Sequence, residues 1–103
     1  MRIISALFIL SASLPASAQQ SYIIDWDAVG EEAVQHLVDL VRIDTTNPPG
    51  NETLVVEYLE GVLADEGIAS QRYALEPERA NLVARQRGNG SKRPLLLMGH
   101  TDV

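Results

Sequence analysis

The chain has 103 residues, of which 46% are hydrophobic and 21% are charged, and its formal net charge is −6. This length allows at most one small domain, and the hydrophobic fraction argues against a disordered or low-complexity chain. The absence of cysteine excludes a disulfide scaffold, a cysteine zinc finger and a thiol nucleophile, and the acidic balance disfavours nucleic-acid binding.

Residues 1–18 have the pattern of a secretory signal peptide. Arg2 supplies a positive charge, residues 3–14 form an apolar run, and residues 16–18 form a small-residue cleavage site. The run is shorter than the roughly 20 residues that a membrane-spanning helix needs. We therefore expect cleavage near Ala18, a periplasmic or secreted protein, and no membrane contact after cleavage.

Two amphipathic helices are predicted next. Asp27 is expected to cap a helix over residues 28–42, in which apolar residues recur at helical spacing. Residues 47–50 read Asn-Pro-Pro-Gly, and the prolines exclude further helix. Asn51 is expected to cap a second helix, and Gly67 is expected to end it.

Strands are predicted after the helices. Residues 68–75 and 81–87 are expected to form strands on either side of a turn at residues 76–78. Residues 94–98 contain a continuous apolar run, which is typical of a strand buried on both faces in the centre of an α/β sheet. The predicted fold class is therefore α/β, with two helices followed by about three strands.

The candidate chemistry follows this last apolar run directly. In open α/β sheets, ligands bind beyond the carboxyl ends of the strands, and Gly99 lets the backbone turn there. His100 offers an imidazole, which is a common metal ligand, and Asp102 could accept a hydrogen bond from the second ring nitrogen. A single histidine at a strand end is more often structural, so this pattern alone leaves both interpretations open.

The other ionisable residues singled out in the sequence are expected to lie at the surface, without a role in catalysis. His36 is expected to be a partly exposed surface histidine, and the second helix is expected to carry solvated charges at Glu52, Glu57 and Glu60. Gly61, inside that helix, is interpreted as a point of close packing.

Two segments carry a resemblance to a known family. Residues 40–52 read LVRIDTTNPPGNE and residues 95–103 read LLLMGHTDV, with the predicted strand at residues 81–84 between them. In this order they resemble the N-terminal end of the zinc-dependent aminoacylase and carboxypeptidase family. That family includes acetylornithine deacetylase, succinyl-diaminopimelate desuccinylase and carboxypeptidase G-type enzymes. The resemblance covers residues 33–103.

The resemblance implies a dizinc metallopeptidase or amidohydrolase, with cobalt as a possible substitute for zinc. Its substrates would be N-acyl amino acids or small peptides, whose C–N bonds are cleaved by a zinc-activated water. In this assignment His100 is the first zinc ligand and Asp102 is the catalytic-site aspartate that orients it. The family's remaining ligands and general base follow further downstream. Residues 19–103 are thus expected to be the incomplete N-terminal part of the catalytic domain, inactive alone, with a homodimer as the full-length assembly.

Two other interpretations stay open. The chain could be a truncated non-catalytic remnant or a binding module, because a catalytic zinc site needs about three protein ligands and the sequence offers only His100 in that role. A related aminopeptidase with a different order of metal ligands is the third interpretation. The Asn-Pro-Pro-Gly loop fits the aminoacylase group better.

Overall fold

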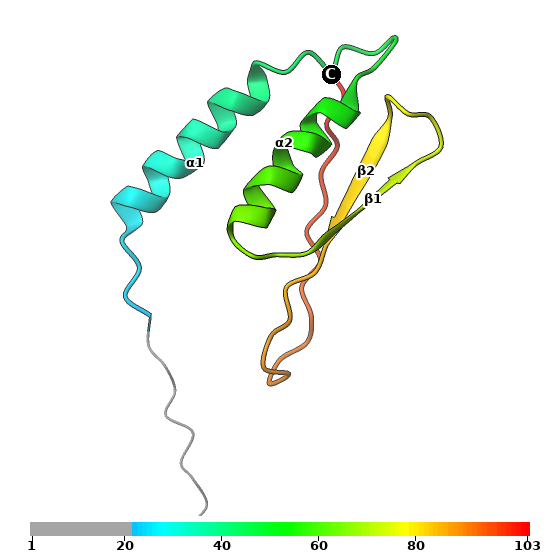
Figure 1. Ribbon diagram of the computed structural model, residues 1–103. Helices are drawn as coiled ribbons and strands as arrows, with labels where there is room; N and C mark the ends of the chain where they lie inside the picture. The colour runs from blue at the N-terminus through cyan, green and yellow to red at the C-terminus, as the bar shows by residue number, and fades with distance from the viewer. Residues whose placement is uncertain (1–21) are drawn as a thin grey trace, which may run out of the picture.

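The structure is a computed structural model that describes residues 22–103, a small domain with two helices and a two-stranded antiparallel sheet (Figure 1). The elements follow the order α1 (Trp26–Val41), α2 (Glu52–Asp65), β1 (Ser70–Ala74) and β2 (Ala80–Ala84). The predicted signal peptide lies outside the described residues. Within residues 22–103, neither helix combines the length and the apolar character that crossing a bilayer requires.

Helix α1 begins earlier than predicted, because its cap is Asp25 and not Asp27. The Oδ1 atom of Asp25 accepts hydrogen bonds from the backbone N–H groups of Asp27 and Ala28, both at 3.1 Å. These two donors have no partner inside the helix, so the carboxylate satisfies them. Asp27 instead lies in the first turn, where the helix dipole favours a negative charge.

Helix α1 lies beside α2 but buries none of its residues (Figure 1). Its contact with α2 is polar: Nδ1 of His36 lies 2.6 Å from the hydroxyl of Tyr58. His36 is partly exposed, as predicted. The apolar stripe of α1 remains open to solvent, and its most exposed members include Trp26, Val34, Leu37 and Val41.

The N-terminus of α2 is held by the turn between the two strands. Asn51 occupies the cap position, as predicted, but its side chain makes no capping hydrogen bond. Thr53 connects the helix to the turn: its N–H donates to the carbonyl of Glu78 at 3.0 Å, and its hydroxyl donates to the carbonyl of Pro77 at 2.7 Å. The same hydroxyl accepts from the N–H of Ala80 at 3.1 Å. The helix and the hairpin therefore form one unit.

The end of α2 agrees with the prediction. Gly67 adopts a φ of +69°, a conformation that favours glycine, and the N–H of Ile68 donates back to the carbonyl of Leu63 at 2.8 Å. The interpretation of Gly61 is wrong, because a Cβ at this position would meet nothing within 4 Å. Gly61 is not a point of close packing.

The two strands form a hairpin whose turn lies where it was predicted. Ser70 pairs with Ala84 and Ala74 with Ala80, so both strands are shorter than the predicted ranges.

The small core lies between α2 and the hairpin. Val55 and Val56 of α2 and Ala80 of β2 are its buried apolar residues. The hairpin and α2 thus bury apolar area against each other.

The prediction of a third, buried strand is wrong for the described structure. Residues 95–98 enter no sheet, and their side chains are 76 to 87% exposed. Figure 1 shows this segment, in red, passing alongside α2 on its way to the C-terminus. An apolar run favours burial, but a strand also needs neighbouring backbone to pair with its N–H and C=O groups. No such pairing exists among residues 22–103, so the sheet has two strands instead of about three.

Candidate functional site

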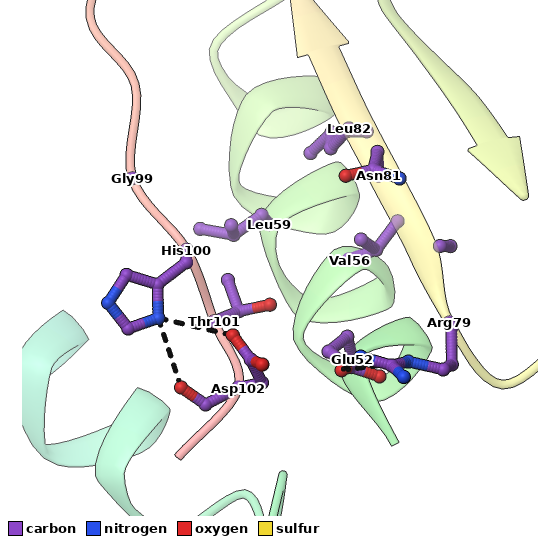
Figure 2. Close-up of a pocket in the computed structure, with 11 residues that line it drawn as sticks. Glu52, Val56, Leu59, Arg79, Asn81, Leu82, Gly99, His100, Thr101 and Asp102 are labelled. Atoms are coloured by element: carbon purple, nitrogen blue, oxygen red, sulfur yellow. Dashed lines mark hydrogen bonds and ion pairs between the residues drawn. The ribbon is translucent and has the colours of Figure 1, made fainter. Parts of the chain in front are cut away.

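His100 and Asp102 lie in contact near the end of the chain (Figure 2). Nδ1 of His100 is 3.2 Å from Oδ1 of Asp102 and 3.1 Å from the backbone oxygen of the same residue. Both oxygens are acceptors, so a proton on Nδ1 satisfies both of them. That tautomer leaves the lone pair on Nε2 of a ring that is 86% exposed, and Nε2 is free to bind a metal ion.

The carboxylate of Asp102 is stabilised in its ionised form. The hydrogen bond from His100, and after it one from Asn47, lowers the pKa of Asp102 below its ordinary value of 3.8. The second contact joins Nδ2 of Asn47 to Oδ2 of Asp102 at 3.5 Å. Asp102 is therefore an acceptor at neutral pH, as an orienting carboxylate must be.

The loop after α1 holds this end of the chain. The hydroxyl of Thr45 donates to the carbonyl of Thr101 at 2.6 Å, and the N–H of Asn47 donates to the carbonyl of Val103 at 3.0 Å. The N–H of Val103 donates in turn to the carbonyl of Thr45 at 3.4 Å. The two segments that carry the family resemblance thus meet in space. The sequence analysis did not single out Thr45, and no local pattern reveals a contact across 56 positions.

A cavity of about 300 Å³ separates residues 99–102 from the helix–hairpin unit. Figure 2 shows His100 and Asp102 on one side of it, with Val56 of α2 and Asn81 of β2 on the other. The ring of His100 points away from α2 and is 86% exposed, so the cavity lies behind the candidate ligand and not in front of its Nε2.

Glu52 closes one end of this cavity, and its prediction as a solvated charge is wrong. It is only 6% exposed, and its Oε1 accepts from Nη2 and Nε of Arg79 at 2.9 and 3.2 Å. Glycine at position 50 makes room for the carboxylate, because a Cβ there would lie 2.8 Å from Oε2 of Glu52. The sequence offers no local signal for this pair, whose members are 27 positions apart.

The other two glutamates of α2 face β1. Nε of Arg72 donates to Oε1 of Glu60 at 3.1 Å, and Nη1 donates to Oε1 of Glu57 at 3.3 Å. The hydrogen bond from Arg72 lowers the pKa of Glu60 below its ordinary value of 4.5. Glu57 is exposed, as predicted, whereas Glu60 is half-buried, and both glutamates pair with the hairpin.

The fit of a zinc ion can be tested on the donors that the structure brings together. His100, supported by Asp102, has the chemistry of one ligand with its orienting carboxylate. Within residues 22–103, no three His, Asp or Glu side chains lie close enough to hold a metal ion. Since a zinc site needs about three protein ligands, the described residues fit part of such a site.

Comparison of the chain with protein-family models, with curated proteins and with solved structures finds no match. The class of the protein must therefore be argued from the His100–Asp102 pair, from its surroundings and from the resemblance of the two segments that meet there.

Proposed function

We propose that this chain contributes His100 as a metal ligand, and Asp102 as its orienting carboxylate, to a zinc-dependent hydrolase. The reaction would be cleavage of amide or peptide bonds in N-acyl amino acids or small peptides. The observation that carries the proposal is the 3.2 Å contact between Nδ1 of His100 and Oδ1 of Asp102, which leaves Nε2 available on a ring that is 86% exposed.

The choice of hydrolase class is supported by the resemblance of residues 40–52 and 95–103 to the aminoacylase and carboxypeptidase family. A chance resemblance in two separate segments gives no reason for them to touch. Here the hydroxyl of Thr45, in the first segment, donates to the carbonyl of Thr101, in the second, at 2.6 Å. This contact favours a shared role for the two segments.

The residues would act through the ring of His100. Asp102 holds the proton on Nδ1, fixes the orientation of the ring and makes Nε2 a better donor. A bound zinc ion would supply a water of lowered pKa and polarise the scissile carbonyl. The further ligands and the general base would have to come from outside the described residues.

The remaining parts of the proposal follow the same resemblance. Zinc is the proposed metal, two ions per site, with cobalt as a substitute. A periplasmic or secreted location is proposed from the signal-peptide pattern of residues 1–18, and a homodimer is the proposed assembly.

The test uses the protein expressed from its complete reading frame and loaded with zinc. Release of free amino acid from N-acetyl amino acids and dipeptides is measured for wild type, His100→Ala, Asp102→Asn and His36→Ala. We expect His100→Ala to abolish hydrolysis and lower the zinc content, and Asp102→Asn to reduce zinc affinity by about 10- to 100-fold. His36→Ala is the matched control, since His36 contacts Tyr58 away from this site. Full hydrolysis by His100→Ala would remove His100 from the metal site.

A non-catalytic role is the second candidate, and the lack of a three-ligand cluster in residues 22–103 favours it. Zinc titration of the 103-residue chain separates the two candidate functions. We expect binding weaker than micromolar, because one imidazole is a poor site on its own. Micromolar binding that disappears in His100→Ala would instead show that this chain forms a zinc site alone.

A further inference from the structure

The peptide between His100 and Asp102 is anchored by one buried hydroxyl. Thr45 is only 3% exposed, and its Oγ1 donates to the carbonyl of Thr101 at 2.6 Å. Two backbone hydrogen bonds flank this contact, one in each direction between residues 45–47 and Val103. Thr101 is the residue that separates the candidate ligand from its carboxylate.

The candidate pair needs such an anchor because little else holds it. Residues 95–98 are exposed and enter no sheet among the described residues, and the ring of His100 is itself largely in solvent. An extended backbone places the two side chains of a His-x-Asp sequence on the same side, but an unrestrained backbone leaves that conformation and its side chains rotate freely. The observed contact between Nδ1 and Oδ1 therefore depends on the conformation at Thr101.

We infer that Thr45 is a positioning residue for His100, whose hydroxyl fixes the peptide at Thr101 so that Asp102 accepts the Nδ1 proton. The inference deepens the proposed function and rests on it for the purpose of the pair. Thr45 acts through the peptide at Thr101: it sets which ring nitrogen of His100 carries the proton. Asn47 supports the same arrangement from the other oxygen of Asp102, at 3.5 Å.

The experiment reads the tautomer of His100 directly. Long-range ¹H–¹⁵N NMR spectra of the metal-free, ¹⁵N-labelled chain are recorded at mildly alkaline pH. The variants are Thr45→Val, which keeps the shape and removes the hydroxyl, and Thr45→Ser, which keeps the hydroxyl. Asp102→Ala is the positive control, and His36 is the internal reference in every sample, because its ring contacts Tyr58 and not this loop.

We expect the Nδ1–H form of His100 to dominate in wild type and in Thr45→Ser. In Thr45→Val and Asp102→Ala its population should fall at least twofold, with the signals of His36 and of the β1–β2 hairpin unchanged. A role of Thr45 in filling space would not move the tautomer, because valine fills the same space.

Two results would overturn the inference. The first is that Thr45→Val keeps the wild-type tautomer of His100 while Asp102→Ala changes it. The second is that Thr45→Ser and Thr45→Val lose the Nδ1–H form of His100 to the same extent. If Thr45→Val loses the hairpin signals, Thr45→Ala takes its place, because the smaller side chain introduces no clash, and the same two results decide.

The failure of this inference is distinguishable from the failure of the proposed function. The tautomer is measured without metal, and zinc chloride is then added while the Nε2 resonance of His100 is followed. A tautomer that depends on Thr45, with full hydrolysis by His100→Ala in the complete protein, would refute the ligand role and leave the positioning intact. A tautomer indifferent to Thr45, with hydrolysis that requires His100, would refute the positioning alone.

Discussion

The helix–hairpin unit of α2, β1 and β2 differs sharply from the segments on either side of it. The unit holds the buried apolar residues of the described structure, which are Val55, Val56 and Ala80. Helix α1 buries nothing, and residues 95–98 are exposed although they are the most apolar run of the described chain. Apolar periodicity is present in both regions, so the difference lies in the partners: α2 and the hairpin face each other, whereas the flanks face solvent.

The largest effect is expected from removing the partner of the buried carboxylate. Arg79→Met leaves Glu52 unpaired, and we expect the unit to lose about 3 kcal/mol of stability, at the low end for a buried pair because Arg79 is itself 40% exposed. Urea unfolding followed by circular dichroism measures the change. Arg72→Met is the control, since Arg72 pairs with surface glutamates, and it should cost much less. Equal losses in the two variants would mean that the burial of Glu52 is unimportant.

A core truncation tests the comparison of the two regions directly. Val56 is 3% exposed and Val34 of α1 is 61% exposed. We expect Val56→Ala to destabilise the chain by about 2 kcal/mol and Val34→Ala to change its stability by less than about 0.5 kcal/mol. Amide hydrogen exchange across the β1–β2 ladder gives both values. A comparable cost for Val34→Ala would show that the stripe of α1 is covered in solution.

Two glycines, Gly61 inside α2 and Gly67 just after it, should change the stability with opposite signs when each is replaced by alanine. Gly67→Ala places a side chain at a φ of +69° and should cost about 1 kcal/mol, whereas Gly61→Ala should stabilise the helix by about 0.5–1 kcal/mol. Neither added Cβ meets an atom within 4 Å, so the backbone conformation alone decides the sign. Thermal unfolding of the two variants beside wild type is the measurement, and a gain for Gly67→Ala would contradict the observed end of the helix.

The smallest expected effect is a loss of folding stability in acid, caused by a carboxylate of the helix–hairpin unit. The pKa of Glu60 is lowered in the folded chain, first by the hydrogen bond from Arg72, so the folded state binds this proton less readily than the unfolded state. The stabilisation is therefore complete above the ordinary value of 4.5 and is lost as the pH falls through the lower folded pKa. Urea unfolding at a series of acidic pH values should show this loss in wild type. The slope of the free energy of unfolding against pH should be smaller in Glu60→Gln than in wild type. An unchanged slope would assign the loss of stability in acid to other carboxylates.

The sequence predicted the elements of the central unit better than their surroundings. Local signals sufficed for Gly67, for the turn at residues 76–78 and for the contact between His100 and Asp102, because each involves near neighbours in the chain. The cap of α1 was misplaced because Asp25 and Asp27 are both good capping residues, and only the backbone conformation at Asp25 decides between them.

The predictions that were wrong or missing share one cause. Each depends on contacts with residues that are far away in the sequence. The burial of Glu52 requires Arg79, and the anchoring of Thr101 requires Thr45. Residues 95–98 were predicted to be a buried strand from their apolar character alone. Whether such a run is buried depends on neighbouring strands, and residues 22–103 provide none for it.

The connection of Thr53 to the turn has a consequence for the order of folding. Its contacts with residues 77–80 close loops of up to 27 positions, whereas the contact between Thr45 and Thr101 closes one of 56. Doubling the length of a loop adds about 0.6 kcal/mol to the entropic cost of closing it. The helix and the hairpin should therefore assemble first, and His100 should reach Asp102 in its final geometry only afterwards. Pulse-labelled hydrogen exchange during refolding would reveal this order, through protection of the β1–β2 ladder before that of the amides of Asn47 and Val103.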